Sequence, residues 1–343
     1  MLNTSVKRFK FVRFGKICMG STTIIGIPGV TKMNIRNIGK MFGALTLALF
    51  ASSAFAGAVL DTGKVTMGVG DDGGLGTVGG VGLALTGGPG DAITPGCLCE
   101  GWGGSADGAL AGYTYGGGSV GIASAVFTPG ATADAATSVV TFTNGLVVTH
   151  VYSAVAGGTL FQIDVSMENT TGVAMTDVRY ARTLDWDVPP GHFTDDFTTI
   201  YGGSAAGPAG DVLHTSFNPF DVPDPTVLRG AFGCAADTSD TDCTGDLGAY
   251  FILSFGEIAA GASHDFVTYI GADFTAGGLL AAFAAVGIEA YSYSFDNDGD
   301  VTYGWGFGDI GLPPALGVPE PGTLSLLGIG LLGAGLVRRR RRV

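Results

Sequence analysis

The chain has 343 residues, of which 46% are hydrophobic, 14% are charged and 60 are glycine. This composition excludes a charge-rich disordered chain and does not match a helix-rich soluble enzyme, so we expect one or two β domains. Between residue 57 and the terminal arginines, 30 acidic residues against four basic ones leave a formal charge of −26. Such a segment repels nucleic acid and anionic membrane surfaces, which excludes nucleic-acid partners, and attracts divalent cations or cationic partners.

The N-terminal segment, residues 1–56, has the pattern of a leader. Two basic residues precede an apolar run at 41–50, and the small-residue motif Ala-Phe-Ala at 54–56 follows it. This order is typical of a secretory signal peptide, and a translation start at Met33 fits it. The residues before Met33 are then an over-long gene prediction or an extended leader. We expect the mature protein to fold in an oxidising compartment.

Residues 60–118 contain short apolar pairs broken by Gly-Gly, Asp-Gly and Pro-Gly, which favour turns and give weak strand signals. A bond between Cys97 and Cys99 would close a small, strained ring, and pairing with Cys234 and Cys243 is the alternative. Cys234 and Cys243 flank an Asp-rich loop and can more easily close on each other. All three connectivities stay open, and the scattered histidines disfavour a zinc site at these thiols.

Strand signals become strong after residue 137. Residues 138–142 and 146–152 predict a hairpin, because Asn144-Gly145 between them is the strongest short turn signal. Residues 161–168 alternate apolar and polar side chains with a period of two, which is typical of a sheet with one buried and one wet face. A partner strand is expected at 177–187.

That partner strand, 177–187, places Arg182 on the apolar face, where a buried guanidinium needs an anion. Asp185 and Asp187 share the opposite face with Arg179, and their side chains stand roughly 7 Å apart. Carboxylates at such a distance suit glycoside hydrolysis, but neighbours on one strand point the same way and do not flank a sugar. We therefore favour a structural ion pair with Arg179 or a cation ligand over catalysis.

The second half of the body predicts further strands and one helix. Proline clusters mark a loop-rich crossing before residue 226, and an Ala- and Leu-rich segment favours a helix. The expected strands are 198–201, 250–255, 265–270, 291–295 and 302–307, and the expected helix is 276–286.

Two acidic loops are candidate calcium sites. The first, 237–246, is rich in Asp and Thr, and the second has Asp at alternate positions from 296 to 300. An EF-hand would need Gly at the sixth position and an acid at the twelfth, and Val301 and Phe307 stand there. Asp and Thr also favour plain turns, so the turn interpretation stays the alternative. The candidate ligands are Asp240, Asp242, Asp296, Asp298 and Asp300.

The C-terminal segment, 319–343, has three parts. The triplet Pro319, Glu320 and Pro321 precedes an uncharged apolar run at 322–337, which is a minimal length for a membrane-spanning helix. Cationic flanks resist translocation, so the body is expected outside the inner membrane. The basic stop consists of Arg338, Arg339, Arg340, Arg341 and Arg342.

This tripartite tail resembles the PEP-CTERM sorting signal of exported Gram-negative proteins. The resemblance implies that an exosortase, a membrane-embedded cysteine transpeptidase, recognises the triplet and cleaves near it. Glu320 is then a recognition residue and not a catalytic one. It also implies anchoring in the inner membrane before processing, a later place at the cell surface or in the matrix, and an envelope rich in exopolysaccharide. The alternative is a plain C-terminal anchor.

We therefore expect an all-β, sandwich-like ectodomain with one short helix, a signal helix and a C-terminal transmembrane helix. The divisions are 1–56, 57–318 and 319–343, with 57–137 and 138–318 as an alternative split of the body. A surface or matrix protein of structural or interaction type, without enzymatic activity, is the leading hypothesis.

Three other functions are alternatives. A carbohydrate-binding module would use Trp102, Trp186, Trp305 and the tyrosines near residue 291 as stacking faces, although core packing is their commoner use. A glycoside hydrolase would use the two carboxylates of 177–187. An ice-binding protein would need regular Thr-x-Thr repeats, which the body lacks.

Overall fold

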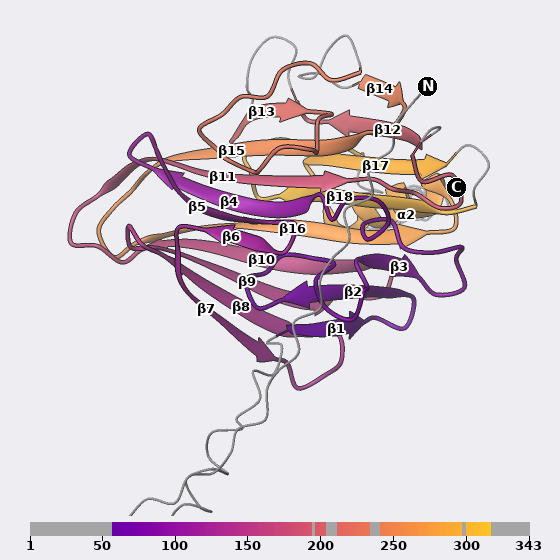
Figure 1. The fold of residues 1–343 in the computed structure, drawn as a ribbon, viewed down its shortest axis with the longest axis horizontal. Coiled ribbons are helices and arrows are strands. Elements are labelled where there is room, and N and C mark those ends of the chain that lie inside the picture. Colours follow the sequence, from indigo (N-terminus) through magenta and orange to yellow (C-terminus); the bar gives the residue numbers. More distant parts are fainter. Residues whose placement is uncertain (1–56, 194–195, 204–210, 234–240, 297–299, 317–343) are drawn as a thin grey trace, which may run out of the picture. The chain divides into compact units, whose positions relative to one another are not determined.

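The computed structural model describes residues 57–193, 196–203, 211–233, 241–296 and 300–316. These residues form three antiparallel sheets and a single helix (Figure 1). The expected β-rich body with one helix is therefore confirmed for the described residues. The signal peptide and the apolar tail lie outside them. Within the described ranges, no helix is long and apolar enough to span a bilayer.

The largest sheet has nine strands. Some strands that are neighbours at its centre are far apart in sequence. The last strand of the described chain pairs with two earlier strands, one on each side. In spatial order the strands are β14 (Thr241–Thr244), β12 (Asp196–Tyr201), β17 (Ala290–Asp296), β18 (Thr302–Gly308), β16 (Ser263–Asp273), β10 (Leu160–Asn169), β9 (Leu146–Ala154), β8 (Ala136–Phe142) and β7 (Ile122–Pro129).

Two smaller sheets complete the strand set. The six-stranded sheet runs in the order β13 (Val212–Ser216), β15 (Gly248–Ile258), β11 (Met175–Asp185), β4 (Glu100–Ala106), β5 (Ala109–Tyr115) and β6 (Gly118–Val120), and the three-stranded sheet in the order β1 (Gly57–Asp61), β2 (Val65–Gly70) and β3 (Leu83–Leu85). The alternative boundary at 137/138 falls inside β8. Strands from before and after it also pair directly, as β4 does with β11.

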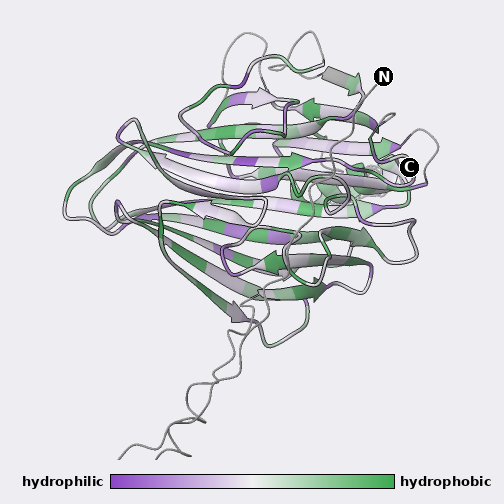
Figure 2. Cartoon of the chain, in the orientation of Figure 1, coloured by the Kyte–Doolittle hydropathy of each residue, from purple (hydrophilic) through white to green (hydrophobic). Residues whose placement is uncertain are grey.

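The nine-stranded and six-stranded sheets pack face to face through aromatic side chains. Tyr180 of β11 contacts Phe266 of β16, with ring centroids 5.1 Å apart, and Phe251 of β15 contacts Trp305 of β18 at 5.2 Å. Figure 2 shows hydrophobic residues recurring along the strands of both sheets. Burial of this apolar surface is the main stabilising contribution to the fold.

The predicted hairpin of 138–142 with 146–152 and the alternation of 161–168 are confirmed, but the pairing expected between 161–168 and 177–187 is wrong. The latter segment is β11, which pairs with β4 and β15 in the six-stranded sheet, while β10 pairs with β9 and β16. The chain crosses to the opposite sheet after β10, so that the apolar faces of the two strands pack in the same core.

β8 and β9 join through Asn144-Gly145, where Gly145 has a φ of 88° that favours glycine. In β10, the side chains on one face are almost fully buried, as the period of two predicts. These buried residues are Phe161, Ile163, Val165 and Met167.

The glycine-rich front, whose strand signals were weak, forms β1 to β6 and a partly buried loop. The loop at 71–74 receives side-chain hydrogen bonds from both large sheets. Trp102 Nε1 of β4 donates to the Asp72 carbonyl at 2.9 Å, and Tyr152 Oη of β9 donates to the Gly73 carbonyl at 3.0 Å. Gly73 has a φ of 77°, and a Cβ there would lie 3.1 Å from His150 Nδ1, so a larger residue would be strained at this position. The loop thereby links the two sheets.

The predicted helix is confirmed as α2 (Ala276–Val286). Thr275 caps its N-terminus by accepting a hydrogen bond from the Gly278 N–H, and Gly287 ends it in the left-handed conformation. Leu279 and Phe283 form an apolar cluster with residues that include Leu160 of β10. Because Phe161 belongs to the core between the sheets, α2 covers the opposite face of the nine-stranded sheet.

Candidate functional site

Three acidic side chains meet where β11 ends. Asp185 is the last residue of β11, Asp187 follows two residues later, and Asp246 lies in the segment between β14 and β15. One carboxylate oxygen from each lies within 4.8 Å of the others. We call these three residues the acid cluster. Asp185 and Asp187 are only 2% and 1% exposed, while Asp246 is exposed.

The backbone around the acid cluster is fixed by consecutive hydrogen bonds. The Asp185 N–H donates to the Cys99 carbonyl at 3.2 Å, the Trp186 N–H to Leu247 at 3.3 Å, and the Asp187 N–H to Ala92 at 3.0 Å. Since Trp186 between the two acids is buried in the core, the two carboxylates point to the same side. Three separate segments therefore position the carboxylates.

Burial and mutual repulsion raise the pKa values of these carboxyls. Burial, with the charge of Asp246, raises the pKa of Asp185 to about 7. Burial, with the charges of Asp185, Asp246 and Asp196, raises the pKa of Asp187 to about 8. Burial also raises the pKa of Asp196 to about 8, aided by the charge of Asp296. The chain thus holds more negative charge here than it neutralises.

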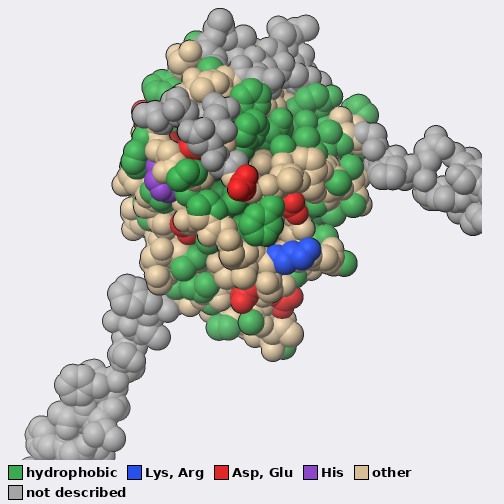
Figure 3. All heavy atoms as spheres, turned by 90° about the vertical axis from the view of Figure 1, so that its right-hand side faces the viewer, with side chains coloured by type: hydrophobic (Ala, Val, Ile, Leu, Met, Phe, Trp, Pro, Cys, Tyr) green, Lys and Arg blue, Asp and Glu red, His purple; other side chains and the backbone are tan. Residues whose placement is uncertain are grey.

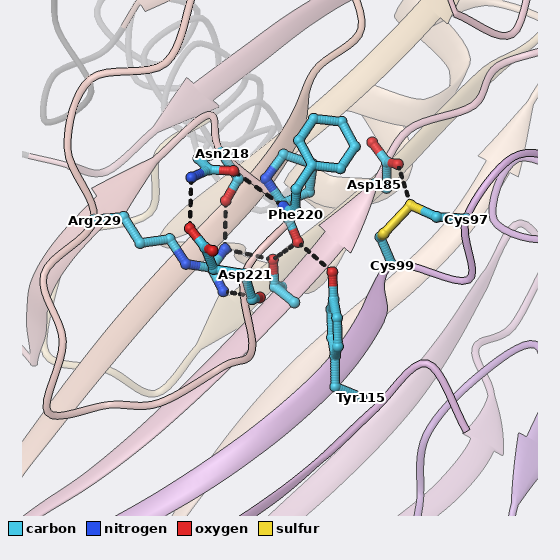
Figure 4. Close-up of a disulfide and its surroundings, with 10 residues drawn as sticks. Cys97, Cys99, Tyr115, Asp185, Asn218, Phe220, Asp221 and Arg229 are labelled. Carbon is cyan, nitrogen blue, oxygen red and sulfur yellow. Dashed lines mark hydrogen bonds between the residues drawn. A yellow bond between two sulfur atoms is a disulfide. The ribbon is translucent and has the colours of Figure 1, made fainter. Parts of the chain in front are cut away.

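A disulfide between Cys97 and Cys99 lies beside the acid cluster. Figure 4 shows the Asp185 carboxylate directed at the Cys97 sulfur, 3.3 Å from Oδ2. A disulfide sulfur carries no proton, so it cannot donate a hydrogen bond to an ionised Asp185. Cys243 is also disulfide-bonded, and Cys234 lies outside the described residues. Cys97 and Cys99 are therefore bonded to each other, and their bond closes the small ring that the sequence analysis regarded as strained.

The arginine expected beside the acids lies elsewhere. Arg179 pairs with Asp177, with Nε and Oδ1 2.8 Å apart, and not with the acid cluster. Arg182 is buried as predicted, and its anion is Glu100 of β4, with Nη2 and Oε1 2.6 Å apart. The ion-pair interpretation of Asp185 and Asp187 with Arg179 is therefore wrong.

The calcium ligands suggested by spacing do not assemble into a site within the described residues. The buried Asp296 Oδ2 accepts a hydrogen bond from the Gly191 N–H at 2.7 Å, and Asp300 is exposed. Asp242 belongs to β14, while Asp240 and Asp298 lie outside the described residues. Sequence reasoning counted Asp246 in the first acidic loop but did not join it to Asp185 and Asp187.

Figure 3 shows the end of the body toward which the β11 arrow points in Figure 1. Acidic side chains appear in several places on this face, among apolar and other side chains. Basic side chains, of Lys or Arg, appear at one place in this view. Most of this face is thus apolar or uncharged, and its visible charged side chains are mainly acidic.

The tryptophans proposed as stacking faces are core residues. Trp102, Trp186 and Trp305 are buried between the sheets and donate hydrogen bonds from their indole N–H groups, so they cannot stack on an external ligand. The tyrosines near residue 291 differ, because the outward side chains of β12 and β17 form an aromatic row. Its members, half-buried except for the buried Tyr291, are Phe197, Tyr201, Tyr291, Tyr293 and Phe295.

The C-terminal segment matches a protein-family model, the PEP-CTERM protein-sorting motif, over residues 317–342. The tail is a PEP-CTERM sorting signal. It marks a Gram-negative protein that is exported, anchored in the membrane by this tail and processed by an exosortase. The triplet of Pro319, Glu320 and Pro321 and the five arginines fall within the match, but all lie outside the described residues. No curated protein matches the chain at a significant level of similarity.

Proposed function

We propose that the chain is a structural or interaction protein of the cell surface or extracellular matrix, released to that place by an exosortase and associated with exopolysaccharide. The observation that carries the proposal is the PEP-CTERM tail behind a strongly acidic, β-rich body. The exopolysaccharide part of the proposal rests on the envelope context that the sorting tail implies. The body is proposed to act by binding and not by catalysis.

The burial of the two candidate catalytic acids supports a non-enzymatic function. A glycosidase needs one carboxyl on each side of a sugar ring that enters the site. Asp185 and Asp187 are 2% and 1% exposed and point to the same side of one strand, so a pyranose ring cannot pass between them. If an envelope glycan were hydrolysed by the protein, the Asp185→Asn variant would decide whether these acids are responsible.

Deleting the exosortase tests the sorting part of the proposal. The full chain is produced in a Gram-negative host with and without an exosortase, and its size and location are followed by fractionation. We expect a shorter surface form with the enzyme, and a full-length membrane form without it. A chain in which Glu320 is replaced by Ala should behave like the host without the enzyme, whereas Glu257→Ala in the body should not. Identical processing in both hosts would contradict the proposal.

Removing the polysaccharide tests the second part. In a host that processes the chain but lacks exopolysaccharide synthesis, we expect the mature protein in the culture medium instead of the matrix. Retention of the protein in the matrix-free cell envelope would show that exopolysaccharide does not hold it there.

The aromatic row favours glycan binding as a second candidate function. Tyr293 and Phe295 are stacked with centroids 6.3 Å apart, and both are half-buried, so their faces are partly open. Aromatic faces of this kind can stack on the apolar faces of sugars. We expect Tyr293→Ala to lose binding to envelope polysaccharide in a pull-down, while Tyr113→Ala, a half-buried tyrosine of β5, keeps it. Equal binding by both variants would remove this candidate.

A further inference from the structure

The acid cluster leaves buried carboxylate oxygens without hydrogen-bond partners. Asp185 Oδ1 and Asp187 Oδ2 are both solvent-inaccessible, and neither has a hydrogen-bond partner among the described residues. Asp185 Oδ2 contacts a disulfide sulfur that has no proton to give. An unpaired buried carboxylate is strongly unfavourable, and folded proteins satisfy such groups with a donor, a counter-charge or a metal ion. The observation therefore points to a partner that the chain does not itself supply.

The three arginines of the described chain are engaged elsewhere, and Lys64, its one lysine, is exposed and forms no ion pair within the described residues. Arg179 binds Asp177 and Arg182 binds Glu100. Arg229 donates to main-chain carbonyls, among them Val222 at 3.0 Å, and lies over the Tyr250 ring. None of these three guanidinium groups has a contact with the acid cluster. Protonation at neutral or lower pH, or a cation from solution, can then neutralise it.

We propose that Asp185, Asp187 and Asp246 bind a divalent cation, and that this cation is calcium. The three oxygens already lie within 4.8 Å of one another, a separation that two ligands of one ion can have. All donors are carboxylates, which select hard cations over zinc or copper, and the nearby thiols are closed in a disulfide. Calcium accepts irregular sets of six to eight oxygens, whereas magnesium requires a near-ideal octahedron.

The exposure of the three residues differs in a way that suits ion exchange with solution. Asp246 is exposed, and the two buried acids lie behind it. An ion can therefore enter at Asp246 and lose part of its water to Asp185 and Asp187, with water completing its coordination. This access also distinguishes the acid cluster from the enclosed Arg182–Glu100 pair, to which no ion from solution has a path.

Bound calcium would join segments that are far apart in the chain. Asp185 and Asp187 belong to the end of β11, and Asp246 to the approach to β15. The neighbouring Asp196 strengthens this connection, because its carbonyl accepts from the Gly245 N–H at 3.0 Å and its Oδ2 accepts from the Val188 N–H at 3.1 Å. The start of β12 is thus attached to both calcium-binding segments, and the ion would stabilise this whole end of the body.

Calcium titration of the full chain tests the site. The protein is purified in detergent, freed of metals with a chelator and unfolded thermally at increasing calcium. At a calcium concentration near 100 times Kd, we expect Tm to rise by roughly 5 to 10 °C. In the Asp187→Asn variant, calcium affinity should fall at least tenfold. This variant should fold, because it removes one of the mutually repelling carboxylates.

A second acidic surface supplies the control. Asp265 of β16 lines a pocket with Asp164 and Asp309, and no residue of the acid cluster lines it. Asp265→Asn therefore changes the net charge by the same amount as Asp187→Asn but leaves the acid cluster intact. This variant should keep the full calcium response. Equal responses of Asp187→Asn and wild type, or no response of wild type at millimolar calcium, would overturn the site. An equal response to magnesium would overturn the assignment to calcium.

Discussion

Two sets of buried carboxylates in the body differ in the hydrogen-bond donors that surround them. Glu100, between the sheets, accepts two hydrogen bonds from Arg182, at 3.0 and 2.6 Å, and a third from the Leu75 N–H at 2.6 Å. Asp185 and Asp187, where β11 ends, have buried oxygens with no donor in the part of the chain that the structure describes. The interior thus carries its own counter-charge, while the end depends on a partner from outside the chain.

This difference follows from access to water. A charge between two sheets can be neutralised only by a residue that folds with it, so Arg182 and Glu100 are placed on neighbouring strands. A charge at the end of a sheet remains within reach of ions. Asp185 and Asp187 can therefore lack an arginine partner. The stability of this end of the body then depends on the cations in solution.

Breaking the internal pair should have the largest effect. Arg182→Met leaves Glu100 buried without a counter-charge, and removal of one partner of a buried pair costs about 3 to 5 kcal/mol of unfolding free energy. Urea denaturation of the full chain in saturating calcium measures the loss. Calcium should not restore it, because no ion reaches Glu100.

The exposed pair of the same strand is the matched control. Arg179 and Asp177 have side chains that are 23% and 38% exposed, so Arg179→Met should cost less than about 1 kcal/mol. Similar losses for Arg182→Met and Arg179→Met would contradict the view that the buried charge depends on its arginine.

A variant without the disulfide separates the contribution of the disulfide to stability from the contribution of the acid cluster. Replacing Cys97 and Cys99 together by Ser opens a loop of only three residues, so loop-closure entropy predicts a loss of about 1 to 2 kcal/mol. The rise of Tm with calcium should persist, since the carboxylates remain. A variant that loses the calcium response as well would show that the disulfide positions Asp185 for the ion.

Local patterns predicted much of the second half of the fold. The alternation in β10 and the Ala- and Leu-rich run of α2 each depend on a single face being buried, which the sequence displays directly. β4 has no such alternation, because every residue from Glu100 to Ala106 is buried. A Cβ at Gly103 would lie 2.2 Å from the Pro223 carbonyl, so the loop around Pro223 covers the second face of this strand.

Of the three residues of the acid cluster, only the pair on one segment could be predicted from the sequence, for a related reason. The spacing of Asp185 and Asp187 places two carboxylates side by side, and sequence reasoning could find them. Asp246 is about sixty residues away, and it joins them because β11 and β15 pair with Asp185 opposite Gly248. Register between distant strands is set by tertiary packing, so no local signal identifies the third ligand.

The last prediction concerns a buried group without charge, and it would sharpen the comparison of the two sets of carboxylates. His150 of β9 lies between the sheets, 3.2 Å from Tyr180 Oη and against Trp102. Burial, with the charge of Arg182, lowers the pKa of His150 well below its usual value. The interior that pairs Glu100 with arginine therefore keeps this histidine neutral.

The sign of the pH effect follows from proton uptake. Below about pH 6.5 the unfolded chain binds a proton at His150 that the folded chain does not, so stability falls as pH decreases. Between pH 7 and 5.5 we expect His150 to account for about 1 kcal/mol of lost unfolding free energy. In urea titrations at saturating calcium, His150→Gln should lose less stability over this range than wild type does. Equal losses would mean that His150 is protonated in the fold, and the interior would then tolerate a charge that no carboxylate balances.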